Sequence, residues 1–195
     1  MAPDEIRCFG SGDPLYERYH DTEWGRPVTD ERALLERICL EGFQSGLSWL
    51  TILRKRDGFR NALADFEPEK LAEYTDDDVD RLLQNADIVR HRGKIEATIA
   101  NGRATAALHA NGETLRDLLW SHAPQDEREP AQTLGDLPPQ TPESKALSKA
   151  LKKIGFRFVG PTTAYAAMQA CGIVNDHLAQ CHVRDDVERE RQNHP

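Results

Sequence analysis

One short segment of the sequence combines an acidic residue, a tryptophan and two glycines. Glu41 lies seven residues after Leu34 and three after Ile38, so a helix through these positions places the carboxylate on its apolar face. A buried carboxylate is costly unless it is paired or hydrogen-bonded, and burial shifts its pKa. Trp49 follows closely, and an acid beside an indole suits a pocket for a flat, hydrogen-bonding ring, a cationic ring included.

Both residues also have purely structural explanations. Glu41 could form a salt bridge with a nearby arginine, or it could turn to solvent if Gly42 and Gly46 end the helix. Trp49 could be an ordinary core aromatic residue. The sequence pattern by itself leaves these alternatives open.

Two cysteine–histidine pairs near the ends of the chain form a second candidate set. Cys8 and His20 lie near the N-terminus, and His177 and Cys181 are four residues apart, so a helical turn would place the latter two on one face. Two cysteines and two histidines are a common tetrahedral zinc set, which leaves no open position and is therefore structural. Alternatively, His177 caps a helix and the cysteines are free thiols, while His182 is a competing ligand.

The charge of the chain is unevenly spread. A net charge of −8 argues against a protein that coats nucleic acid nonspecifically. Residues 144–160, however, contain five basic residues and no acidic ones, and a second basic group occupies residues 90–94. The five are Lys145, Lys149, Lys152, Lys153 and Arg157. A local basic surface of this kind can bind the phosphate groups of nucleic acid.

The same segment contains a glycine-bearing turn between two predicted helices, a helix-hairpin-helix arrangement. Gly160 and Pro161 are suited to open the second helix. The N–H groups of the turn and the positive end of that helix can hold a phosphate without reading sequence. The alternative is an ordinary helical hairpin with a solvated lysine face.

Helical periodicity dominates the rest of the chain, and strand signals are nearly absent. One helix is expected after the cap Asp30 and another after the cap Thr75. Four more are expected at residues 94–109, 113–120, 145–154 and 161–171, and the last of them ends at Gly172. A proline-rich surface loop at about 121–143 separates two helical blocks. We therefore expect one all-α domain over residues 1–184, followed by a charged, disordered tail at 185–195.

The composition predicts a cytoplasmic protein. No run approaches about 18 consecutive apolar residues, and the N-terminus has no secretory signal. In a reducing compartment the four cysteines are not expected to form disulfides. Cys39 and Cys171 lie inside helical patterns and are expected to be core residues.

Six segments of the chain together resemble the bacterial 3-methyladenine DNA glycosylase I family. They are DPLYERYHDTEWG (13–25), ICLEGFQSGLSW (38–49), RHRGKI (90–95), LSKALKK (147–153), FVG (158–160) and MQACGIVNDH (168–177). The resemblance runs from about residue 8 to about residue 181, nearly the whole chain.

The resemblance implies an all-helical glycosylase of the helix-hairpin-helix superfamily that flips out 3-methyladenine and releases it hydrolytically from alkylated double-stranded DNA. It implies one structural zinc ion, held by Cys8, His20, His177 and Cys181. No lysine is placed as a Schiff-base nucleophile, so we expect a monofunctional enzyme without a lyase step. Asp176 is given no catalytic role. We further expect a monomer that does not contact membranes.

For the base pocket, the resemblance implies that Glu41 hydrogen-bonds the flipped adenine and is the residue needed for catalysis. Trp49 stacks on the base, and Tyr19 and Tyr16 complete the wall. Methylation at N3 makes the base a cationic leaving group, which a carboxylate and an indole distinguish from neutral adenine. The residues expected to contact DNA are Gly46, Leu47, Lys153, Gly160 and Thr162.

Two other classes of protein compete with this interpretation. One is a noncatalytic, zinc-clasped module that binds DNA structurally, and the other is a nuclease or other metalloenzyme. A pure phosphate binder has no need of Glu41 beside Trp49, and four protein ligands leave a metal no open position.

Overall fold

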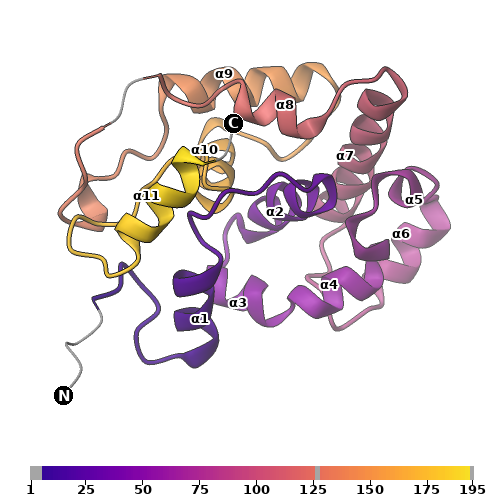
Figure 1. The fold of residues 1–195 in the computed structure, drawn as a ribbon. Helices are drawn as coiled ribbons and strands as arrows, with labels where there is room; N and C mark the ends of the chain where they lie inside the picture. Colours follow the sequence, from indigo (N-terminus) through magenta and orange to yellow (C-terminus); the bar gives the residue numbers. More distant parts are fainter. Residues whose placement is uncertain (1–5, 126–127, 194–195) are drawn as a thin grey trace.

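The protein is described by a computed structural model over residues 6–125 and 128–193 (Figure 1). These residues form helices and connecting loops without any strand, which confirms the all-α prediction. The helices are α1 (Pro14–Thr22), α2 (Glu31–Gln44), α3 (Trp49–Arg54), α4 (Arg56–Ala62), η1 (Ala64–Phe66), α5 (Pro68–Ala72), α6 (Asp76–Leu83), α7 (Arg92–Ala110), α8 (Leu115–Trp120), η2 (Leu134–Asp136), α9 (Pro142–Lys153), α10 (Pro161–Ala170) and α11 (Arg184–Gln192). No described helix is both long and apolar enough to span a bilayer.

Side-chain caps begin the helices where the sequence indicates. The Asp30 carboxylate accepts from the Ala33 N–H at 2.9 Å and starts α2. Thr75 and Asp78 form the capping box of α6. Gly160 is the N-cap of α10, whose first residue is Pro161. These three predicted helix starts are confirmed.

Two helices begin earlier than the periodicity of apolar residues indicates. The α9 helix starts at Pro142 because Thr141 caps it by accepting from the Ser144 N–H at 3.2 Å. The α7 helix starts at Arg92 because the His91 ring caps it. In both cases a polar first turn precedes the first apolar residue, so the cap and not the apolar pattern sets the boundary.

The prediction of a disordered tail is wrong for the described part of residues 185–195. Residues 184–192 form α11, which buries Val187 completely. Arg191 in the last turn donates to the carbonyl oxygens of Gly172 at 2.9 Å and Ile173 at 3.1 Å. Composition alone could not reveal these contacts, which bind the helix to the end of α10. Residues 194 and 195 lie outside the described part.

The α2 helix occupies the centre of the fold. It contacts α3, α7, α8 and α10, and Figure 1 shows it between α8 and α9 on one side and α1, α3 and α4 on the other. The first described residues meet the loop that precedes α11, where the His182 N–H donates to the carbonyl oxygen of Ile6 at 3.0 Å. A second, smaller apolar cluster around Trp24 and Leu178 fills this junction.

Candidate active site and metal centre

Glu41 lies in the last turns of α2 and faces the interior, as its spacing from Leu34 and Ile38 predicts. Its exposed fraction is only 8%, and its carboxyl group forms no hydrogen bond or ion pair with any described residue. Burial raises the pKa of Glu41 to about 8, against the smaller opposing influence of the Arg37 charge. The carboxyl group is therefore an unpaired, buried acid that is ready to accept a partner.

Two tyrosine rings lie near this acid, and a tryptophan packs against one of them. Tyr16 and Tyr19 come from α1, and their ring centroids are 6.4 Å apart. Trp49 opens α3, and its ring centroid lies 5.3 Å from that of Tyr19. Burial first and the Glu41 charge second raise the pKa of both tyrosines, which indicates that the carboxyl group lies near both hydroxyl groups. The structure thus brings together all four residues predicted for the base pocket.

The Nε1–H group of Trp49 is buried and has no hydrogen-bond partner among the described residues. Buried donors are almost always paired, so an orphaned one needs an explanation. A narrow cavity of about 60 Å³ lies beside Tyr19 and Trp49. Two ion pairs also line this cavity: Arg56 donates to Glu23 at 2.9 Å, and Arg60 donates to a Glu36 oxygen at 2.8 Å.

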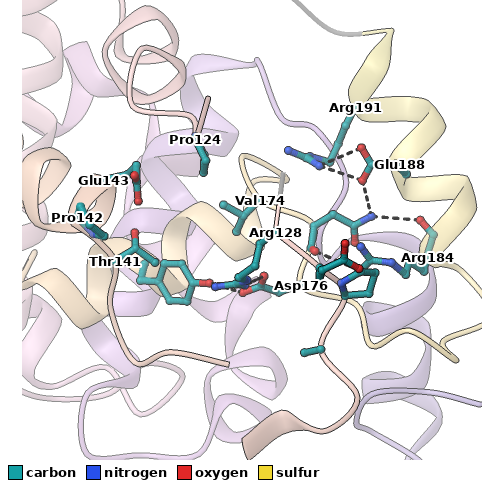
Figure 2. Close-up of a pocket in the computed structure, with 15 residues that line it drawn as sticks. Pro124, Arg128, Thr141, Pro142, Glu143, Val174, Asp176, Arg184, Glu188 and Arg191 are labelled. Carbon is teal, nitrogen blue, oxygen red and sulfur yellow. Dashed lines mark hydrogen bonds and ion pairs between the residues drawn. The ribbon is translucent and has the colours of Figure 1, made fainter. Parts of the chain in front are cut away.

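A larger cavity of about 480 Å³ lies elsewhere, between α10, α11 and the loop that precedes α9 (Figure 2). It is lined by none of the residues predicted to bind a base. Asp176 is almost fully buried at its wall, where it accepts from the Tyr165 hydroxyl at 2.6 Å and from Gln169 at 2.7 Å. Arg128 completes this set as an ion-pair partner, pointing toward Asp176 in Figure 2. The carboxylate of Asp176 therefore joins the loop to α10.

The four candidate metal ligands meet at the junction of the chain ends. Their ligand atoms all lie within 4.8 Å of one another, and all four residues are buried. The Cys181 Sγ lies 3.3 Å from His177 Nδ1 and 3.5 Å from His20 Nε2, and the Cys8 Sγ lies 3.6 Å from His177 Nδ1. Tetrahedral zinc, with bonds of about 2.3 Å to sulfur and 2.0 Å to nitrogen, separates such ligands by about 3.5 Å. The donor set and its spacing fit a metal ion.

The outer nitrogen of each histidine is also held in place. His20 Nδ1 lies 2.8 Å from an Asp21 oxygen, and His177 Nε2 lies 3.0 Å from the carbonyl oxygen of Trp24. Metal-binding histidines are typically oriented by such outer partners. Gly25 has a φ of +79°, and a Cβ there would lie 2.8 Å from His177 Nε2, so a side chain at this position would displace the ring.

The thiols of this cluster differ in acidity. Hydrogen bonding from the Cys8 thiol, together with His177 and His20, lowers the pKa of Cys181. The same pairing raises the pKa of Cys8. A thiolate is the form that binds metals, and the neighbours of Cys181 stabilise its ionised form.

The prediction that His177 and Cys181 share a helical turn is wrong. The segment is a loop between α10 and α11, and it closes through the Cys181 N–H, which donates to the Leu178 carbonyl oxygen at 2.9 Å. The tight turn still brings both side chains to one point. His182 lies outside the cluster, with its Nδ1 3.1 Å from the carbonyl oxygen of Ile6.

The residues predicted to contact DNA lie at two places on the surface. Gly46 and Leu47 are exposed in the turn after α2, where Gly46 has a φ of +83°. Lys153 and Thr162 are exposed on either side of the α9–α10 hairpin, and Gly160 caps α10.

Sequence reasoning misjudged one residue of the basic segment at 90–94. Lys94 is buried, and its Nζ donates to the carbonyl oxygens of Phe43 at 2.8 Å and Ser45 at 2.6 Å. The sequence signal that could have indicated the burial of Lys94 was its neighbour Ile95, an apolar residue on the buried side of α7. The basic neighbours of Lys94 masked that signal.

Residues 9–185 match the protein family described as Methyladenine glycosylase. A curated relative, DNA-3-methyladenine glycosylase 1 of Escherichia coli (strain K12), is 53% identical over 179 residues, which cover 90% of this chain and 95% of the relative. A crystal structure of 3-methyladenine DNA glycosylase I matches with a TM-score of 0.88 at 52% identity and covers 91% of this chain and 98% of that one. A structure that addresses 3-methyladenine recognition by the Staphylococcus aureus glycosylase matches with a TM-score of 0.84 at 37% identity, over 91% and 95% of the two chains.

Proposed function

The chain belongs to the methyladenine glycosylase family, and on this basis we propose that it releases 3-methyladenine from alkylated DNA by hydrolysing the N-glycosidic bond. The observation that carries the proposal is the buried, unpaired Glu41 beside Tyr16, Tyr19 and Trp49. Burying this acid is energetically unfavourable, and a protein that only bound DNA phosphates would have no use for it.

In the proposed mechanism the nucleotide leaves the duplex and its base enters the pocket of Glu41 and Trp49. With a pKa of about 8, Glu41 is mostly protonated in the empty pocket at neutral pH. A cationic N3-methylated base favours the ionised carboxylate, so its arrival releases the proton and forms a charge-assisted hydrogen bond. The electron-rich indole of Trp49 attracts the same charge through its face. Neutral adenine gains neither interaction.

The bond to the sugar then breaks without protonation of the base, because methylation has already made it a good leaving group. The sugar passes through an oxocarbenium-like state, and water attacks it. Lys94 is a buried lysine in the first turn of α7. Its ammonium group donates to two backbone carbonyl oxygens. It is therefore unsuited to act as a Schiff-base nucleophile, which supports a monofunctional enzyme.

We propose that double-stranded DNA lies across the α9–α10 hairpin and the turn after α2. The first turn of α10 follows Gly160, and the first N–H groups of a helix lack intrahelical partners, so they are available to a phosphate; Lys153 and Thr162 flank this turn in the chain. Leu47 is exposed and lies between Glu41 and Trp49 in the chain. We propose that its side chain borders the space in the duplex that the extruded base leaves. The enzyme is proposed to act as a monomer.

For the metal centre we propose one zinc ion, held by Cys8, His20, His177 and Cys181. Two sulfur and two nitrogen ligands suit zinc, and they fill its tetrahedral coordination. When bound, the ion cross-links the two ends of the chain and takes no part in the reaction. The ligand loop that it fixes also anchors α11.

The deciding experiment is the release of free bases from methylated duplex DNA, resolved by chromatography. We expect 3-methyladenine to appear and 7-methylguanine to stay in the DNA. Glu113→Gln, an exposed change far from the pocket in sequence, is the matched control for Glu41→Gln. A folded wild-type sample that releases no base would favour the noncatalytic DNA-binding module instead.

A further inference from the structure

Phe158, at the tip of the α9–α10 hairpin, is an exposed aromatic residue that the proposed function does not use. Its exposed fraction is 41%, and few other large apolar residues of the described chain are as exposed. Its φ of +55° lies in the left-handed region, which bulky side chains rarely adopt and glycine adopts freely. A large side chain in such a conformation calls for an explanation.

The hairpin imposes this conformation through bonds on both sides of Phe158. The Arg157 N–H donates to Asn101 Oδ1 at 2.7 Å, and the Ser148 hydroxyl donates to the Val159 carbonyl oxygen at 2.5 Å. Phe156 and Val159 point inward and are buried. The hairpin is therefore already anchored by its neighbours, and the ring of Phe158 is not needed to hold it.

The side chain of Phe158 begins beside Gly42, the residue that follows Glu41 in α2. A Cβ on Gly42 would lie 3.4 Å from the Phe158 Cβ, and one on Gly93 would lie 3.8 Å from its Cε2. The Phe158 side chain therefore extends from the end of α2, at Gly42, to the start of α7, at Gly93. His91 meets it edge-on, with ring centroids 6.3 Å apart.

Unpaired cations lie on the same hairpin as Phe158 and on the segment before α7. Four exposed basic residues of the hairpin and of the segment before α7 have no side-chain partner among the described residues. They are Arg90, Lys152, Lys153 and Arg157. An exposed aromatic ring on the same surface segment as free cations is suited to bind a nucleic acid strand, because the cations bind phosphates while the ring packs on sugars or bases.

We propose that Phe158 is an apolar DNA contact, whose ring packs against the sugar–base edge of the duplex beside the extruded nucleotide. This inference rests on the proposed function for the presence of an extruded nucleotide. It assigns the hairpin two roles, phosphate binding by its cations and N–H groups and apolar contact by Phe158. On this interpretation, the strained backbone conformation at Phe158 serves to keep the ring exposed to solvent, where DNA can reach it.

The test measures binding to a duplex that carries a stable abasic-site analogue, by fluorescence anisotropy at several salt concentrations. Phe158→Ala is expected to weaken binding roughly tenfold, with the slope of log affinity against log salt unchanged because no charge is lost. Phe158→Leu is expected to recover part of the affinity. Leu134→Ala, at a residue that is 49% exposed on η2, is the matched control and is expected to bind like wild type.

Two further measurements separate a DNA contact from a structural plug. Free 3-methyladenine should bind Phe158→Ala as it binds wild type, and Phe158→Gly should melt within a few degrees of wild type because glycine tolerates the φ at this position. Unchanged DNA affinity in Phe158→Ala would overturn the inference. So would a joint loss of free-base binding and thermal stability.

The outcome is distinguishable from a failure of the proposed function. If wild type binds the duplex but releases no 3-methyladenine, the glycosylase proposal fails, while the anisotropy series still decides the role of Phe158. A wild-type protein that does not bind the duplex overturns both proposals.

Discussion

The ammonium group of Lys94 donates a 2.6 Å hydrogen bond to the carbonyl oxygen of Ser45, directly after the last turn of α2. It donates a second bond of 2.8 Å to the carbonyl oxygen of Phe43. The last carbonyls of a helix lack backbone donors, and the negative end of the helix dipole favours a cation there. Glu41 precedes these carbonyls and Trp49 follows them, so Lys94 fixes the turn that relates the acid to the indole.

Lys94→Met should therefore weaken both the fold and the pocket. The carbonyls of Phe43, which is buried, and Ser45 would lose their donor, at a cost of about 1–3 kcal/mol in unfolding free energy. The affinity for free 3-methyladenine should fall with it, as measured by calorimetry on folded protein. Lys70→Met, at an exposed lysine on α5, is the control and should change neither quantity. Full base affinity in Lys94→Met would show that the turn is held by other contacts.

The raised pKa of Glu41 predicts a pH dependence of stability. The folded pKa is about 8 and the ordinary value is 4.5, so at intermediate pH the unfolded chain ionises Glu41 while the folded protein keeps it protonated. Stability should fall as pH rises through this window, by up to about 1.4 kcal/mol per pH unit, and then level off above pH 8. Glu41→Gln removes the effect.

Denaturant unfolding of wild type and Glu41→Gln between pH 5 and 9 measures this dependence. The Gln variant should gain stability relative to wild type as pH rises toward 8, because all other titrating groups cancel in the comparison. Parallel stability curves would mean that Glu41 ionises in the folded protein as it does in water.

The fold was predictable where a cap and an apolar stripe coincide. Asp30 and Thr75 mark the starts of α2 and α6 in this way. The α11 helix lacks both signals, since a single apolar residue, Val187, is buried and Val183 caps without a side-chain bond. Its stability comes from Arg191 binding the carbonyls after α10, a contact between segments that composition does not encode.

The residue types of the two sites were predictable, but their local geometry was not. Helical spacing predicted that Glu41 faces inward, because α2 is regular through that residue, but it left open whether the carboxyl group is paired. His177 and Cys181 converge through a turn that their four-residue spacing did not reveal. Lys94 illustrates a further limit, since a lysine among basic neighbours looks like a surface residue until its carbonyl partners are known.

Glu41→Gln also tests base recognition directly. Replacing the carboxylate by an amide removes a charge-assisted hydrogen bond, which is worth about 1.5–3 kcal/mol and corresponds to a loss of roughly 10- to 100-fold in affinity for 3-methyladenine. Calorimetry of Glu41→Gln beside Glu113→Gln measures the difference. Equal affinities in the two variants would remove Glu41 from the recognition site.

The buried Cys2His2 cluster predicts one metal ion per chain by elemental analysis. Cys181→Ser should lose the ion and melt at a lower temperature, because the cluster joins the N-terminal segment to the loop before α11. A strong chelator should have the same effect on wild type. Cys39→Ser is the matched control, since Cys39 is equally buried in α2 but lies outside the cluster, and it should keep the ion. A metal-free wild-type sample with an unchanged melting temperature would contradict the proposal, because the chain ends would then be held by hydrogen bonds and apolar packing alone.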